Sequence, residues 1–304
     1  MDENMPGKTA YTAPSREICG WAIGGIATHA LICMYGQAMN IFTVGFGLKA
    51  AVVGWAMMLP RVFDALIDPM MGHFSDNLDT RWGRRKPFLV GGALAGGLFV
   101  ALLWWGNREW SETAQLIYLT VVGTLFYCSW GLYSMAWNSL GYELTDDYNH
   151  RSRVAAIGGL FAAAVLALNG WTYWFALRPF FGGEVYGIRW ISAGVALVAI
   201  AAALHAATTC RERFAKVNKV HTPMVAALRT TLGNRPFVIL LLYKFCQILG
   251  ERVFMGLLFY LGMYYVCKGD KDLATSITGL GGTIGSFLGF AVMPLIPVVS
   301  RRLG

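Results

Sequence analysis

Eight long apolar segments constrain this sequence more than any other feature. A helix needs about 20 apolar residues to span the hydrocarbon core of a bilayer. Eight segments meet this length: 18–43, 50–74, 88–106, 114–140, 154–176, 188–209, 236–265 and 276–300. β-strands are excluded, because a membrane barrel would show short segments of alternating polarity instead. The sequence therefore predicts an all-α, polytopic membrane protein.

The overall composition supports this class and excludes others. Of the 304 residues, 56% are hydrophobic and only 14% are charged, which is too apolar for an ordinary soluble domain. The net charge of +8 does not indicate nucleic-acid binding, because the basic residues occur in short connections and form no continuous basic face. The six cysteines are scattered without a CxxC pair, so we interpret them as packing residues. We expect no metal, no cofactor and no nucleic-acid partner, and a monomer surrounded by lipid.

The distribution of lysine and arginine predicts the orientation of the chain. With the N-terminus in the cytoplasm, the cytoplasmic segments carry sixteen Lys and Arg residues and the opposite loops carry six. Cytoplasmic loops of membrane proteins are enriched in these residues. We therefore expect a cytoplasmic N-terminus, in the plasma membrane of a bacterium.

The longest connection divides the chain into three parts. We predict an N-terminal six-helix bundle over 1–209, a cytoplasmic linker over 210–235 and a partial C-terminal bundle over 236–304. Within the linker, Pro223–Leu232 has the spacing of a short amphipathic surface helix, and a plain solvated linker is an equal alternative.

One apolar segment contains an arginine and two carboxylates. Residues three and four apart share a helix face, so Arg61, Asp64 and Asp68 form one stripe about two turns long. Facing lipid, the stripe would cost several kcal/mol, so we expect it to face the bundle interior or a water-filled cavity. Two close carboxylates disfavour double ionisation, which suits a binding site for H⁺ or a monovalent cation. The alternative is an ion-pair network that only fixes the helix.

A charged loop follows this stripe directly. Its acidic residues, its turn-forming glycine and its basic cluster can pair with helix ends and hold the cytoplasmic face closed. The alternative is a pure orientation signal. The residues that we assign to this gating loop are Asp76, Arg81, Gly83, Arg84, Arg85 and Lys86.

The stripe and the loop together resemble a known family. Asp64-Ala65-Leu66-Ile67-Asp68-Pro69, Met71-Gly72 and Arg81-Trp82-Gly83-Arg84-Arg85-Lys86-Pro87 are similar to the motifs of the glycoside–pentoside–hexuronide cation symporters. This family is the branch of the major facilitator superfamily that includes melibiose permease. The resemblance implies the major facilitator fold, with about 8 of 12 helices present and a truncated second half, because the repeat of this loop would begin at Ser300.

The resemblance also implies alternating access, with a sugar-like solute and a coupling cation bound between the halves. By position, Asp64 and Asp68 match the cation-site carboxylates, and Thr28 and Ser134 fall where the family has sugar-binding aspartates. Ile67 and Gly131 replace two residues that supply oxygen ligands to sodium. Since a proton needs one carboxylate and sodium needs several oxygens, we expect H⁺ to be favoured over Na⁺.

Further polar and aromatic residues in the apolar segments are candidates for solute contacts. Aromatic rings can stack on sugars and amides can fix their orientation. For each, helix–helix hydrogen bonding is the alternative. We expect Lys244 to be a buried cation that pairs with Asp64, Asp68 or an anionic solute. The candidates besides Thr28 and Ser134 are Gln37, Trp130, Trp137, Asn138, Lys244 and Gln247.

The predicted function is therefore cation-coupled symport of a sugar or related small solute. An enzyme is not expected: both aspartates lie on one helix without the Gly-x-Gly-Asp motif of intramembrane proteases, and no HExxH, GxSxG or P-loop is present. Two alternatives stay open. The chain is a transport-inactive fragment of such a symporter, or the solute is an anion other than a sugar.

Overall fold

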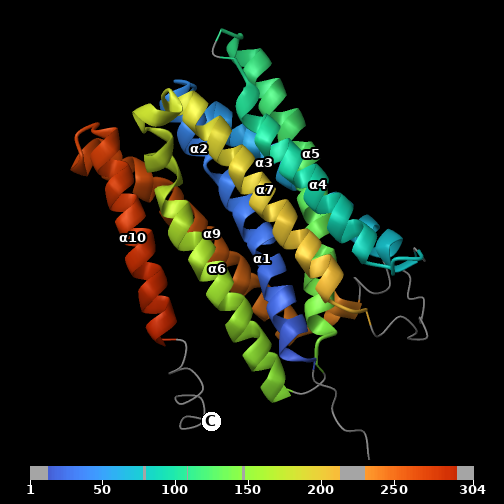
Figure 1. The fold of residues 1–304 in the computed structure, drawn as a ribbon. Helices are drawn as coiled ribbons and strands as arrows, with labels where there is room; N and C mark the ends of the chain where they lie inside the picture. The colour runs from blue at the N-terminus through green and yellow to red at the C-terminus, as the bar shows by residue number, and fades with distance from the viewer. Residues whose placement is uncertain (1–12, 78–79, 108, 146–147, 213–229, 293–304) are drawn as a thin grey trace, which may run out of the picture. The chain divides into compact units, whose positions relative to one another are not determined.

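A computed structural model describes residues 13–77, 80–107, 109–145, 148–212 and 230–292, which form helices and connecting turns (Figure 1). No β-strand occurs among these residues. The longer helices are α1 (Ser15–Gly36), α3 (Ala50–Asn77), α4 (Lys86–Leu102), α5 (Glu112–Tyr142), α6 (Tyr148–Ala176), α7 (Glu184–Thr209), α9 (Arg235–Tyr260) and α10 (Lys271–Val292). Short helical pieces extend or join them: α2 (Ala38–Asn40), η1 (Ile41–Gly45), η2 (Leu103–Trp105), η3 (Pro179–Phe181) and η4 (Leu261–Val266).

The described part of each of the eight predicted apolar segments is mostly helical, which confirms the all-α class. In the described part of the chain, six helices are long and apolar enough to cross a membrane: Ser15–Gly45, Lys86–Trp105, Glu112–Tyr142, Arg153–Ala176, Glu184–Thr209 and Lys271–Val292. Helices α3 and α9 are outside this set, and both carry ionisable residues near their middle.

The chain separates into two compact units, Met1–Arg213 with Gly279–Gly304, and Phe214–Thr278. The end of α10 belongs to the first unit, where the Trp171 indole nitrogen donates to the Thr283 hydroxyl at 2.8 Å. The predicted division at 209 and 236 stays a prediction. Most of the proposed amphipathic segment, residues 223–229, lies outside the described residues.

In the first unit, α1 packs against α5, α6 and α7, while α4 packs against α5 and α7, and α3 packs against α5 (Figure 1). Glycine allows the closest approaches. A Cβ atom on Gly92 of α4 would lie 2.7 Å from the Tyr133 backbone nitrogen of α5, and one on Gly24 of α1 would lie 2.7 Å from Ala206 of α7. Small residues at such contacts are typical of helix packing in membranes.

A pair of tryptophans fastens α1 to α5. The Trp21 and Trp137 rings stack with centroids 4.8 Å apart, and each indole nitrogen donates to the backbone oxygen of the other residue, at 3.0 and 2.8 Å. Both side chains are buried, so each indole N–H needs such an acceptor. This pair fixes the start of α1 against the end of α5.

The connection after α1 and the connection after α9 have the same backbone design. Each helix passes into a π-helical turn, in which the amide of Phe46 bonds to Ile41 and the amide of Cys267 bonds to Gly262. A residue with positive φ follows in both cases, Gly47 at 78° and Lys268 at 50°. Helices α3 and α10 then begin three residues later. The second unit thus repeats a local feature of the first, as expected for a fold built from repeats.

Candidate functional site

The stripe on α3 is connected to α5 through its arginine. The Arg61 Nε donates to the Tyr127 hydroxyl at 2.9 Å, and the guanidinium lies 5.8 Å from the centroid of the same ring. The Arg61 side chain is exposed, whereas Tyr127 is only 4% exposed. An ionised group at bilayer depth is stable only beside water or polar partners. Arg61 therefore lies against the aromatic wall of α5, where the Tyr127 hydroxyl is its polar partner.

Neighbouring aromatic rings hold Tyr127 in place. The Tyr35 ring of α1 meets Tyr127 edge-on at 4.9 Å and stacks on Phe126 at 5.0 Å. Tyr35 and Phe126 are fully buried, and the Tyr35 hydroxyl makes no hydrogen bond in the described structure. Edge-on and offset ring pairs are favourable beyond the area that they bury. The acceptor of Arg61 is thus positioned by packing, and sequence reasoning did not identify it.

The carboxylates of the stripe follow Arg61 along α3. Asp64 is half-buried and lies on the same helix face, three residues from Arg61. Asp68 lies one turn further along the same face, but its side chain, like that of Asp76, is outside the described part of the structure. The structure therefore brings Arg61 and Asp64 to one face of α3, and α5 supplies a fixed partner for the arginine.

Two of the predicted solute residues, Trp130 and Thr28, meet where α1 and α5 pack, and Ser134 lies one turn from Trp130 on α5. The Trp130 indole nitrogen donates to the Thr28 backbone oxygen at 2.9 Å, and the Ser134 hydroxyl donates to the Gly131 oxygen at 3.2 Å. The Thr28 hydroxyl is buried and makes no hydrogen bond within the described residues. Trp130 and Ser134 thus have structural partners, while the Thr28 hydroxyl keeps its hydrogen-bonding capacity.

Trp137 and Asn138 differ although they are adjacent. Trp137 is buried in the indole pair with Trp21, which gives it a structural role. Asn138 is exposed and lines a cavity of about 290 Å³ together with Arg151 and Thr145. Arg151 was not among the predicted solute residues. Its position beside Asn138 makes it a further candidate for a solute contact.

Gln37 is engaged with another helix. Its amide nitrogen donates to the Asn169 side-chain oxygen at 3.2 Å and to the Asn169 backbone oxygen at 3.3 Å, which links α1 to α6. In the second unit, the Lys244 ammonium donates to the Gln247 side chain at 3.0 Å. Lys244 is exposed on α9, so the expectation of a buried cation is not met. Helical spacing of three residues makes Gln247 its nearest polar partner.

The gating loop is held by two glutamates that follow the ends of α5 and α7, Glu143 and Glu212. The Glu212 carboxylate accepts the backbone amides of Arg84, Arg85 and Lys86 at 2.8, 2.9 and 3.0 Å, where α4 begins. The Arg85 guanidinium forms an ion pair with Glu143 at the end of α5. A carboxylate is stabilised by the unsatisfied amides of a helix N-terminus.

The turn before α4 depends on glycine. Gly83 has φ of 106°, and a Cβ atom there would lie 2.7 Å from a carboxylate oxygen of Glu212. Arg81 is exposed, and the Arg84 Nε is buried without a hydrogen-bond partner in the described structure. The predicted pairing of the loop with helix ends therefore occurs, through the basic residue Arg85 and through backbone amides. Glu212 lies 128 residues from Arg84, so no local pattern pointed to this contact.

Among the described residues, no three His, Cys, Asp or Glu side chains come together as a metal site. Among the described side chains, the stripe on α3 offers the Arg61 guanidinium and the Asp64 carboxylate, with hydroxyl and amide groups on α5 nearby. Such groups can bind a proton, a monovalent cation or the hydroxyls of a polar solute.

Comparison with known proteins gives consistent matches over most of the chain. Residues 20–304 match the family described as MFS/sugar transport protein. The chain is 25% identical over 295 residues to the glucuronide carrier protein homolog of Escherichia coli (strain K12), covering 95% of this chain and 62% of that protein. It is 25% identical to the putative glycoside/cation symporter YagG of the same organism, covering 82% and 53%. It is 24% identical to the isoprimeverose transporter of Lactiplantibacillus pentosus, covering 88% and 55%. The chain thus spans less than two thirds of the length of these relatives.

Proposed function

The chain belongs to the MFS/sugar transport protein family and is an integral, multi-pass membrane protein, and from this we propose that it carries a sugar or glycoside across the membrane by alternating access. The named relatives include carriers of a glucuronide and of isoprimeverose, which supports a glycoside or hexuronide as the solute. The orientation that we propose has the N-terminus in the cytoplasm of a bacterium, as the distribution of lysine and arginine predicts.

The solute binds, in this proposal, along α1 and α5 of the first unit. The buried Thr28 hydroxyl has unused hydrogen-bonding capacity. Asn138 and Arg151 place an amide and a guanidinium in the wall of a cavity at one end of these helices. Sugar hydroxyls are bound by such amide, hydroxyl and guanidinium groups. Trp137 supports this site by fixing α1 against α5, and Trp130 fixes the same seam through the Thr28 backbone.

The coupling ion binds at Asp64 and Asp68. The observation that carries this proposal is the hydrogen bond from Arg61 to Tyr127, because it joins the ionisable stripe of α3 to the helix that holds the solute candidates. Protonation of Asp64 would weaken its electrostatic attraction for Arg61. Because Arg61 is hydrogen-bonded to Tyr127, a shift of the arginine would in turn act on α5. We propose H⁺ as the ion, since Ile67 and Gly131 offer no side-chain oxygen to a sodium ion.

Uptake into proteoliposomes tests this function. A panel of glycosides, pentosides and hexuronides is offered under an inward H⁺ gradient or an inward Na⁺ gradient at fixed pH. We expect one solute class to accumulate with the H⁺ gradient and not with the Na⁺ gradient. Asp64→Asn and Asp68→Asn should each abolish accumulation, whereas Glu112→Gln, a change of an exposed glutamate at the start of α5, should not. Accumulation that follows Na⁺ at fixed pH would refute proton coupling, and no uptake of any solute would refute the carrier function.

A further inference from the structure

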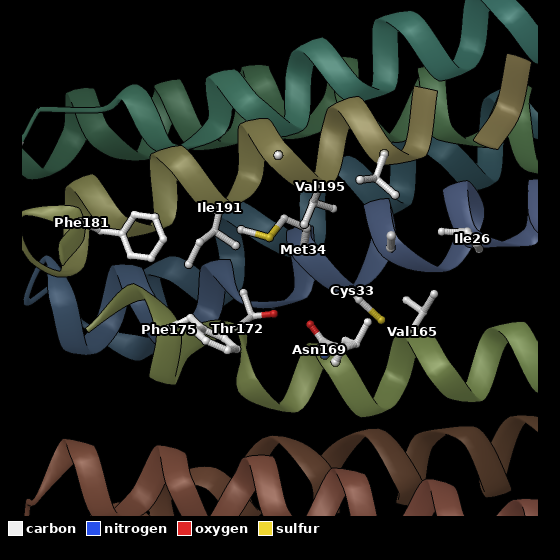
Figure 2. Close-up of a pocket in the computed structure, with 14 residues that line it drawn as sticks. Ile26, Cys33, Met34, Val165, Asn169, Thr172, Phe175, Phe181, Ile191 and Val195 are labelled. Atoms are coloured by element: carbon white, nitrogen blue, oxygen red, sulfur yellow. The ribbon is translucent and has the colours of Figure 1, made fainter. Parts of the chain in front are cut away.

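A long apolar groove runs along the first unit, between α1, α6 and α7 (Figure 2). Its volume is about 400 Å³. Figure 2 shows Cys33 and Met34 of α1 between the side chains of α6 and those of α7, such as Val165 and Val195. Phe181 of η3 lies at one end of the groove. Neither Arg61 nor Asp64, the described residues of the stripe, lines it.

The chemistry of the lining does not suit a sugar. Twelve of the fourteen lining residues are apolar or glycine, and the two polar ones are Asn169 and Thr172. The Asn169 side-chain oxygen already accepts a hydrogen bond from Gln37. A sugar that entered would lose its bonds to water without finding partners for its hydroxyls, which is costly in an apolar site. The groove therefore suits a hydrocarbon ligand.

The dimensions identify the form of that hydrocarbon. The lining residues extend from Ile26 to Met34 on α1 and from Val165 to Phe175 on α6. At 1.5 Å per residue these stretches are about 12 and 15 Å long. One leaflet of the hydrocarbon core is about 15 Å thick. The groove is therefore long enough for one extended hydrocarbon chain that spans one leaflet.

The walls of the groove continue onto the surface that faces lipid. Leu168 and Val198 line the groove and are 70% and 57% exposed, and the neighbouring Leu166 and Leu197 are exposed large apolar residues as well. In an integral membrane protein, exposed apolar side chains on spanning helices contact acyl chains. We propose that the groove is a specific binding site for one acyl chain of a phospholipid, in the leaflet nearest Phe181. This proposal depends on the membrane location of the chain and not on its transport activity.

Gly194 offers a direct way to fill the groove. It lines the groove, and a Cβ atom at this position meets no atom within 4 Å. Gly91 on α4 has equally open surroundings, is exposed and is not a lining residue, so Gly91→Leu is the matched control. The protein is purified after reconstitution in phosphatidylethanolamine and phosphatidylglycerol, and retained phospholipid is counted by native mass spectrometry. We expect Gly194→Leu to reduce retained lipid about tenfold, because leucine occupies the space of several methylenes, and Gly91→Leu to leave it unchanged.

Photochemical labelling locates the bound chain independently of protein stability. In vesicles with a trace of phospholipid that carries a diazirine in the middle of its acyl chain, label should concentrate on peptides that contain Cys33, Leu168 and Val195. Gly194→Leu should remove this label, while Gly91→Leu should keep it. Equal lipid retention in both variants, or label spread evenly over all exposed helices, would overturn the proposal. Loss of solute binding in Gly194→Leu with unchanged lipid retention would also overturn it and would assign the groove to the solute.

Discussion

At the scale of single residues, the arginine of the α3 stripe is defined by its partner on another helix. Tyr127 accepts the Arg61 hydrogen bond, and its own position is fixed by the rings of Tyr35 and Phe126. A hydrogen bond to a charged group contributes about 1.5–3 kcal/mol, roughly twice a neutral one. The guanidinium is therefore held toward α5, and this contact determines how much of its charge Asp64 experiences.

Tyr127→Phe tests this contact, because it removes the hydroxyl and keeps the ring packing. We expect proton-coupled uptake to fall about tenfold, since the guanidinium loses its acceptor and can then pair with Asp64 in its place. The measurement is the initial rate of uptake into proteoliposomes. Tyr142→Phe on the same helix, where the side chain is 77% exposed, is the control and should leave the uptake rate unchanged. Equal rates in Tyr127→Phe and wild type would show that the hydrogen bond has no role in coupling.

Trp137 shows how one residue type can fit two interpretations. An aromatic side chain in a membrane helix suits a sugar platform, but here the ring is buried against Trp21 with both indole nitrogens hydrogen-bonded. The adjacent Asn138 is exposed. The rotation of α5, which its packing against α1 sets, buries Trp137 and leaves Asn138 exposed.

At the scale of elements, the connections after α1 and α9 follow one design with different residues. In both, a π-helical turn ends in a residue with positive φ, glycine at 47 and lysine at 268. The left-handed conformation costs a non-glycine residue about 1–2 kcal/mol. The second connection therefore carries a conformational cost that the first avoids.

Lys268→Gly should relieve this cost. We expect a higher melting temperature in detergent, corresponding to about 1 kcal/mol, although the added freedom of glycine in the unfolded chain offsets part of the gain. Gly47→Ala should have the opposite effect, because alanine would be strained at φ of 78°. Gly54→Ala, inside α3 with no atom within 4 Å of its Cβ position, is the unstrained control and should raise the melting temperature, because alanine favours a helix over glycine. A lower melting temperature for Lys268→Gly would contradict the expected strain.

At the scale of the whole molecule, one end of the first unit is fastened by contacts between distant parts of the sequence. Glu212, just after α7, accepts three amides at the start of α4, and Glu143 at the end of α5 pairs with Arg85. Helices α4, α5 and α7 are thus tied together through one loop. Any movement of this loop has to break these bonds or carry all three helix ends along.

Glu212→Ala should release the loop without unfolding the bundle. Three amides lose their acceptor, so we expect hydrogen exchange in residues 80–89 to become about tenfold faster. Mass spectrometry of the corresponding peptides measures the exchange. Glu109→Ala, a change of an exposed glutamate in the loop between α4 and α5, should leave these peptides unaffected. Unchanged exchange in Glu212→Ala would mean that other groups hold the start of α4.

The sequence alone determined the elements and the class of the molecule. Eight apolar segments predicted eight long helices, because the length of a spanning helix is set by the bilayer and is visible in a single stretch of sequence. The stripe of Arg61, Asp64 and Asp68 and the motif up to Pro87 indicated the family, which the match over residues 20–304 confirms. These features are local, and local spacing and burial cost are sufficient to detect them.

Only the tertiary structure decided which side chains contact one another across helices. Tyr127 lies 66 residues from Arg61, Trp137 lies 116 from Trp21, and Glu212 lies 128 from Arg84. No spacing rule joins such pairs, because the rotation and approach of packed helices select which side chains meet. For the same reason the groove beside Met34 was not foreseen, since it exists only where α1, α6 and α7 leave space between them. Helix formation follows from residues near one another in sequence, whereas a binding site is formed by residues that only the fold brings together.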